Sequence, residues 1–107
     1  MEIIQYQIFL VNLTPTIGSE IQKARPCVVI SPNEMNRNLQ TVVIAPMTTS
    51  SKNYPTRIMV RHNNKRGWVI LDQIRTIDKQ RIQKELGMLS KTEIKVVKAI
   101  LKETYVD

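Results

Sequence analysis

The fold of this chain is decided by two stretches, Pro26-Cys27-Val28-Val29-Ile30 and Thr41-Val42-Val43-Ile44-Ala45. Both are uninterrupted apolar runs rich in β-branched residues. The turn formers Ser31-Pro32-Asn33 follow the first run, and Pro46 follows the second. Runs of this length and composition are typical of strands that are buried on both faces. We therefore predict that these two segments form the centre of a sheet.

The flanking segments add further strands. Residues Gln5–Asn12 are β-branched and aromatic enough for a strand, and turn formers from Thr14 to Ser19 end it. Residues Thr56–His62 alternate apolar and polar side chains, and a polar turn over 63–67 leads into Trp68–Leu71. This pattern predicts a β-hairpin.

The period of the pattern changes near the end of the chain. Ser90 and Glu93 form the sequence signature of a capping box. The apolar residues after it recur at helical spacing, which predicts a helix over about 91–103. Residues 78–89 are ambiguous, because Asp78 could cap a helical turn while Gly87 suits a strand. We favour a turn followed by a short strand.

The length and residue usage limit the architecture. With 107 residues the chain supports one domain, residues 1–107. Cys27 has no partner for a disulfide within the chain, and one cysteine with one histidine, His62, cannot supply four metal ligands. No stretch is apolar enough to span a membrane, so we expect a cytoplasmic protein. The elements predict a mainly β fold, a small curved barrel of five to seven strands with a C-terminal helix.

The positive charge is concentrated in the central third of the chain. The net charge is +7, and residues 52–84 alone carry nine basic residues against two acidic ones. A face with this excess would attract a polyanion such as nucleic acid. A basic surface that serves only solubility explains the composition equally well.

Three blocks of sequence resemble the MazF/PemK toxin family. They are Thr14-Pro15-Thr16-Ile17-Gly18-Ser19-Glu20 leading to Arg25-Pro26, then Ala45-Pro46-Met47-Thr48-Thr49, then Asp72-Gln73-Ile74-Arg75-Thr76-Ile77-Asp78. The resemblance implies a small SH3-like β-barrel that forms a homodimer. It also implies sequence-specific cleavage of single-stranded messenger RNA without a metal ion or cofactor, and neutralisation by a cognate antitoxin of the MazE/PemI type.

The resemblance also implies site residues. The two that match the family's active site are Arg25 and Thr48, while Glu20 and Asp72 match positions that act in catalysis or positioning. The residues that we expect to contact RNA are Thr49, Ser50, Lys52, Tyr54, Arg57 and Gln73. The chain departs from the family pattern at Tyr6-Gln7, at Ile21 and at Ile70, where one branch of the family has an arginine.

The chemistry of RNA cleavage suits these residue types. The 2′-hydroxyl must lose a proton, the phosphorane must be stabilised and the departing 5′-oxygen must be protonated. A guanidinium such as that of Arg25 binds two phosphate oxygens at once and stays charged. The hydroxyl of Thr48 can donate a hydrogen bond to the phosphate. Without the resemblance, Arg25 would be interpreted as half of a surface ion pair with Glu20, and Thr48 as a turn former. The general base is left unassigned.

The other chemically distinctive side chains have simpler interpretations. We expect Trp68 in the core or at a dimer interface, and we favour Tyr54 over it for stacking on bases. We expect Cys27 to be a buried thiol and His62 to be solvated. Asp72 is expected to position an arginine or to satisfy backbone donors rather than to act as a base.

Two other functions fit the same sequence. A gyrase poison of the CcdB type would share the fold, would not need the pair Arg25 and Thr48, and would leave RNA intact. A barrel that binds nucleic acid without cutting it would also use the basic central third.

Overall fold

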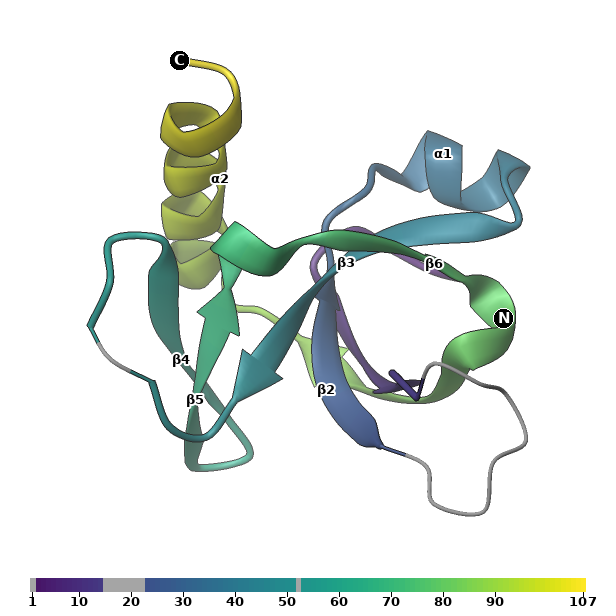
Figure 1. The fold of residues 1–107 in the computed structure, drawn as a ribbon, viewed down its shortest axis with the longest axis horizontal. Coiled ribbons are helices and arrows are strands. Elements are labelled where there is room, and N and C mark those ends of the chain that lie inside the picture. The colour runs from purple at the N-terminus through teal and green to yellow at the C-terminus, as the bar shows by residue number, and fades with distance from the viewer. Residues whose placement is uncertain (1, 15–22, 52) are drawn as a thin grey trace.

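The computed structural model describes residues 2–14, 23–51 and 53–107, whose path is shown in Figure 1. These residues form a curled antiparallel sheet with a helix at each of two places on its surface. The strands are β1 (Gln7–Asn12), β2 (Ala24–Val29), β3 (Thr41–Thr48), β4 (Arg57–His62), β5 (Lys65–Ile70), β6 (Arg75–Asp78) and β7 (Ile82–Met88). The α-helices are α1 (Asn33–Asn38) and α2 (Lys91–Tyr105), and the short 3-10 helices are η1 (Leu71–Gln73) and η2 (Lys79–Arg81).

The two apolar runs lie side by side at the centre, as predicted. The strand order is β4-β5-β3-β2-β1-β7, and β6 pairs with β3 off this path. Strand β3 is the longest, with eight residues. Its first half pairs with β6 and its last two residues, Met47 and Thr48, pair with β5. The change of partner along β3 lets the sheet curl.

Both faces of the central strands are buried, which confirms the expectation from their composition. Cys27 and Val29 belong to one core cluster, together with Phe9 and Ile44. Val28, between them, belongs to a second cluster, which includes the buried residue Val97 of α2. Because successive side chains of a strand point to opposite faces, one strand contributes to both cores.

The β4–β5 hairpin is present, but its turn is shorter than predicted. Only Asn63 and Asn64 form the loop, both with positive φ, at 52° and 63°. Two-residue loops of this kind match the twist of the strands that they join, and asparagine tolerates positive φ better than most residues. Lys65 and Arg66, which the sequence had placed in the turn, are therefore the first residues of β5.

Helix α2 begins at the predicted capping box and extends two residues beyond the predicted end. The Ser90 Oγ accepts a hydrogen bond from the Glu93 backbone N–H at 3.1 Å, and Glu93 Oε1 accepts one from the Ser90 N–H at 2.9 Å. Glu93 Oε2 also accepts the Arg61 N–H at 2.9 Å, which ties the helix start to β4. At the other end, the Tyr105 hydroxyl donates to the Leu71 carbonyl at 2.6 Å.

The start of β1, helix α1 and residues 78–89 test three local predictions. The first strand begins at Gln7 rather than Gln5, because Tyr6 has a left-handed backbone with φ of 71°. The short helix α1 stands where the sequence suggested only a turn. The region 78–89 is a turn at η2 followed by β7, as favoured. In the described residues, no helix is long and apolar enough to cross a membrane.

Candidate active site

Arg25 and Thr48 lie on adjacent strands, at the ends where β2 and β3 leave the sheet. The β2–β3 register pairs Cys27 with Pro46. Arg25 is two residues from Cys27 and Thr48 is two residues from Pro46, so each side chain lies on the same face of its strand as that paired residue. The β2–β3 ladder ends at this pair, and Met47 and Thr48 pair with β5 instead. The backbone of Arg25 is held from its other side, where it pairs with Val11 of β1. The Arg25 side chain is exposed and has no hydrogen-bond or ion-pair partner within the described ranges, so its guanidinium is available to an anion.

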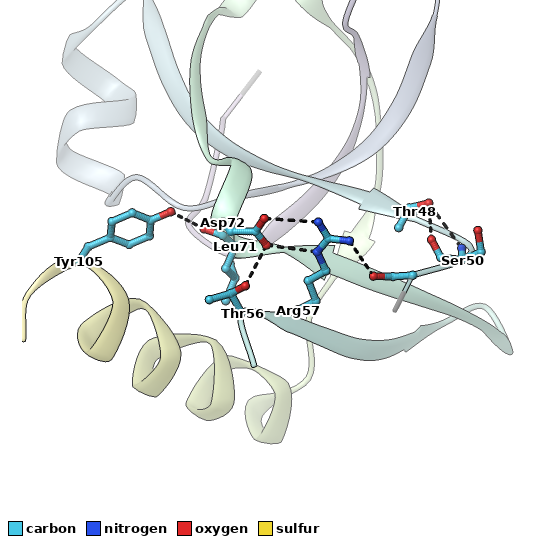
Figure 2. A network of polar contacts seen from close by, with 8 residues as sticks. Thr48, Ser50, Thr56, Arg57, Leu71, Asp72 and Tyr105 are labelled. Carbon is cyan, nitrogen blue, oxygen red and sulfur yellow. Dashed lines mark hydrogen bonds and ion pairs between the residues drawn. The ribbon is translucent and has the colours of Figure 1, made fainter. Parts of the chain in front are cut away.

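The Thr48 hydroxyl organises the turn that follows β3. It donates a hydrogen bond to the Ser50 carbonyl at 3.1 Å and accepts one from the Ser50 N–H at 3.4 Å, as Figure 2 shows. These contacts fit the interpretation of Thr48 as a turn former, and they do not exclude a second role at a phosphate. The same contacts fix the hydroxyl at the strand end, where it can exchange its carbonyl partner for a phosphate oxygen.

Asp72 holds Arg57 in a fixed orientation (Figure 2). Its Oδ1 accepts hydrogen bonds from the Thr56 hydroxyl at 3.0 Å and from Arg57 Nε at 3.3 Å, and its Oδ2 accepts one from Arg57 Nη2 at 3.4 Å. These bonds, chiefly those from Arg57, lower the pKa of Asp72. Arg57 also donates to the Ser51 hydroxyl at 3.0 Å. Asp72 therefore positions an arginine, as expected, and its hydrogen bonds make it a poor general base.

The same network covers one side of Tyr54. The Arg57 guanidinium carbon lies 4.8 Å from the centroid of the Tyr54 ring, within cation–π distance. Asp72 in turn is placed by η1, whose buried Leu71 is anchored on both sides. The Leu71 N–H donates to the Thr56 carbonyl at 3.0 Å, and its carbonyl accepts the Tyr105 hydroxyl.

A small apolar pocket opens beside Thr48. It has a volume of about 160 Å³ and is lined by Ile8, Pro26, Met47, Thr48, Thr49, His62, Lys65, Arg66, Gly67 and Leu86. The expectation that His62 is solvated is wrong. Its Nε2 atom is buried and has no hydrogen-bond partner among the described residues, and its ring packs against Gly87 of β7. Strands β4 and β7 are the two ends of the sheet order, so no local sequence pattern could predict this contact.

Cys27 is a fully buried thiol, as expected. Burial raises its pKa to about 12, although the charges of Arg75 and Arg25 act in the opposite direction. Because the thiolate is the reactive form of cysteine, Cys27 is not a nucleophile at neutral pH.

The remaining predicted residues fall into two groups. Glu20 and Lys52 lie outside the described residues, so the structure does not test them. The side chains of Thr49, Ser50, Tyr54 and Gln73 are exposed, as contact with RNA would require. No group of three or more histidine, cysteine, aspartate or glutamate side chains comes together in the part of the chain described here.

One residue near the site was not assigned to it from the sequence. Trp68 lies directly opposite Thr48 in the β3–β5 register. It is half-buried and belongs to neither core cluster, so the core position is wrong. The alternative, a dimer interface, stays a prediction. Counting back from a two-residue turn at Asn63 and Asn64 would have placed Trp68 opposite Met59, on the surface of the hairpin.

Comparison with known proteins shows which family the chain resembles. The model of the family described as the PemK-like, MazF-like toxin of type II toxin-antitoxin systems matches residues 4–105. A protein named Endoribonuclease MazF from Staphylococcus saprophyticus is 32% identical over 96 residues, covering 84% of this chain and 80% of the relative.

Solved structures have the same fold. A MazE-MazF complex from Deinococcus radiodurans superposes with a TM-score of 0.82 at 24% identity, covering 96% of this chain and 95% of that one. An endoribonuclease in complex with its cognate antitoxin from a Mycobacterial species gives a TM-score of 0.81 at 22% identity, covering 94% and 92%. The family-model match over nearly the whole chain, together with the relative at 32% identity, identifies this chain as a member of the PemK-like, MazF-like toxins of type II toxin-antitoxin systems.

Proposed function

We propose that this chain is a sequence-specific endoribonuclease that cuts single-stranded messenger RNA in the cytoplasm and so halts translation. The observation that carries the proposal is that Arg25, near the start of β2, and Thr48, at the end of β3, lie on neighbouring strands and on the faces that Cys27 and Pro46 share. The Arg25 guanidinium, which has no partner among the described residues, and the Thr48 hydroxyl can together hold a phosphate. The relative named Endoribonuclease MazF supports RNA cleavage over a gyrase poison or a barrel that only binds nucleic acid.

In the proposed reaction, the 2′-hydroxyl attacks the adjacent phosphorus and the 5′-oxygen leaves, giving a 2′,3′-cyclic phosphate and a 5′-hydroxyl. Arg25 stabilises the negative charge that builds up on the phosphorane oxygens. The Thr48 hydroxyl turns from the Ser50 carbonyl to one of these oxygens. Asp72 is committed to Arg57 by its hydrogen bonds. Of the two carboxylates in the resembling blocks, Glu20 is therefore the candidate for the general base.

Arg57 extends the phosphate contacts beyond the cleaved bond. Asp72 and Ser51 fix its guanidinium from two sides, so little side-chain entropy is lost when it binds a further phosphate. We assign Arg57 to binding the neighbouring phosphate rather than the reacting one. Thr49, Ser50, Tyr54 and Gln73 are exposed around it and complete the RNA surface.

We also propose a homodimer and an antitoxin partner. The MazE-MazF structures from Deinococcus radiodurans are complexes of a toxin with its antitoxin. A basic central third of the chain suits an acidic antitoxin segment that folds when it covers the RNA site.

The test is cleavage of a long RNA by the purified protein in excess chelator, with the cut ends mapped by primer extension. We expect discrete cuts from the wild type and a rate about 100-fold lower for Arg25→Ala, as for the loss of one donor to a developing oxyanion. Thr48→Ala should also lose activity. Arg37→Ala, which removes an exposed arginine of α1, is the matched control and should cut normally.

The proposal fails if the wild type leaves RNA intact while it still slows growth when expressed, a result that would redirect the search to gyrase. Normal cutting by Arg25→Ala would instead remove that residue from the cleavage centre.

A further inference from the structure

The strand registers line up three side chains across one face of the sheet. The strand order at this end is β4-β5-β3-β2. Trp68 of β5 pairs with Thr48 on one side and with Met59 on the other. The row across the face therefore reads Met59, Trp68, Thr48. Arg25 lies near the start of β2, the strand that follows β3 in this order.

This row faces outward from the core under the hairpin. The neighbours of its members along each strand, Ile58, Val69 and Met47, are buried in one core cluster. Side chains alternate between the two faces of a strand, so Met59, Trp68 and Thr48 project to the opposite side. Met59 is 46% exposed, and Trp68 is half-buried. The indole thus forms part of the surface beside the proposed cleavage centre.

Arginines lie on the two neighbouring rungs of the same face. On one side, Arg61 pairs directly with Arg66, and both are exposed. Neither has an ion-pair partner in residues 2–14, 23–51 and 53–107. On the other side, Arg57 is held by Asp72. Like charges directly opposite each other on a sheet are destabilising. An anion bound between Arg61 and Arg66 would remove this repulsion.

We infer that Trp68 is a base-stacking residue for the RNA substrate, and that Arg61 and Arg66 bind the phosphate beside the stacked base. This inference rests on the proposed function. Directly paired residues have Cα atoms about 4.5–5.5 Å apart, so a base on Trp68 belongs to a nucleotide next to the phosphate held at Thr48. Same-face rungs are about 7 Å apart, which places the two arginines on the next step of the strand.

The positive charges on this face favour RNA over a second copy of the chain as its ligand. A second copy of the chain docked here would bring its own Arg61 and Arg66 toward an already positive surface, whereas a single-stranded RNA supplies phosphates for the arginines and a base for the indole. Stacking on an aromatic ring tolerates any base, so Trp68 contributes affinity and register along the RNA rather than base identity. Tyr54, favoured from the sequence, already has Arg57 against its ring.

The chain contains one tryptophan, so its fluorescence reports on this site alone. The probe is an RNA oligonucleotide that spans a mapped cut and carries a 2′-deoxy sugar at the cleaved position, which blocks cleavage. We expect it to quench the emission of Trp68 with the same Kd that anisotropy of the labelled RNA gives. Trp68→Leu should bind about 10-fold more weakly, and Trp68→Phe should keep most of the affinity. Met35→Ala, an exposed apolar residue of α1, is the matched control.

The arginines are tested by salt dependence. Arg61→Gln with Arg66→Gln should weaken binding and reduce the slope of log Kd against log salt concentration by about 0.7, the value for one phosphate contact on a single strand. Lys95→Gln with Lys102→Gln, which removes two exposed charges of α2, should leave both quantities unchanged. A double arginine variant with an unchanged slope would overturn the phosphate assignment.

The outcomes separate this inference from the proposed function. If the wild type cuts RNA but Trp68→Leu binds and cuts normally, the stacking role is wrong and the nuclease stands. If the wild type binds RNA with quenching of Trp68 but never cuts it, the stacking role stands and the nuclease is wrong. A third outcome would assign this face to a second copy of the chain. In that case RNA binds without changing the emission of Trp68, and the Trp68→Leu protein no longer sediments as a dimer.

Discussion

Gly87 lies where β7 meets the end of β4, and we predict that Gly87→Ala destabilises the protein by about 3 kcal/mol. Two effects add. The backbone of Gly87 has φ of +146°, a conformation that costs residues with a side chain about 1–3 kcal/mol. A Cβ at this position would also stand 2.3 Å from Cε1 of His62, well inside van der Waals contact. Relieving such an overlap costs about 1–3 kcal/mol more.

The assay is urea denaturation of four proteins in a double-mutant cycle: wild type, Gly87→Ala, His62→Ala and both together. His62→Ala alone should cost little, because the imidazole that it removes carries a buried Nε2 with no hydrogen-bond partner within the described residues. In the double variant the overlap is gone and only the backbone strain remains. We therefore expect a favourable coupling of about 1–3 kcal/mol.

Gly67→Ala is the matched control. Its Cβ would meet the flexible end of Met47 at 3.3 Å, and its φ is not positive, so the loss should be under about 1 kcal/mol. The reasoning is refuted if Gly87→Ala costs less than about 0.5 kcal/mol, which lies within the range of neutral surface changes. A cycle with no coupling would show that the approach of His62 is not part of the cost.

Three further predictions concern stability and activity. Because burial raises the pKa of Cys27 to about 12 while the unfolded thiol ionises near pH 9, the free energy of unfolding should fall by about 1.4 kcal/mol per pH unit between about pH 9 and pH 12. Cys27→Ala should abolish this alkaline slope in urea titrations, and an unchanged slope would contradict it. Asp72→Asn should cost only about 0.5 kcal/mol, because the ion pair with Arg57 is partly exposed, yet it should slow RNA cleavage about 10-fold by freeing Arg57. A large stability loss with normal cleavage would argue against the positioning role. Ser90→Ala removes the hydroxyl that accepts the Glu93 N–H and should lower the thermal midpoint by about 4–8 °C, corresponding to about 1 kcal/mol; no shift would mean that the cap contributes nothing.

The elements that could be predicted from the sequence are those with a strong local pattern. The runs 26–30 and 41–45 are apolar without interruption, and Ser90 with Glu93 marks a helix start within four residues. Helix α1 has no such signal. It is a six-residue polar segment, held by Asn36, whose Oδ1 accepts the Ser31 hydroxyl at 2.5 Å and whose Nδ2 donates to the Ser31 carbonyl at 2.9 Å. A buried amide of this kind is invisible to any count of apolar residues.

The contacts of the candidate site also differ in how far the sequence could predict them. Arg25 and Thr48 were named by the resemblance to a family, but that they lie on neighbouring strands depends on the pairing of β2 with β3. Asp72 and Arg57 lie 15 residues apart in the sequence and meet only because η1 folds against the start of β4. The approach of His62 to Gly87 joins the two edge strands of the sheet, β4 and β7, and so requires the curvature of the whole barrel. The periodicity of apolar residues describes residues that are close in the sequence. These contacts join residues that are far apart in the sequence, so periodicity could not predict them.

The placement of the titratable groups narrows how the proposed cleavage can work. The single histidine has its Nε2 buried against β7, Cys27 keeps its proton at neutral pH, and Asp72 is bonded to Arg57. Among the described residues near Thr48, the groups left to face a phosphate are guanidiniums, hydroxyls and the ammonium of Lys65, all of which stabilise negative charge. We therefore expect stabilisation of the phosphorane by Arg25 and Thr48 to supply much of the rate enhancement, with Glu20 as the candidate base. A stacked base on Trp68 would serve this mechanism directly, because fixing the neighbouring nucleotide aligns the 2′-hydroxyl with the phosphorus before charge develops.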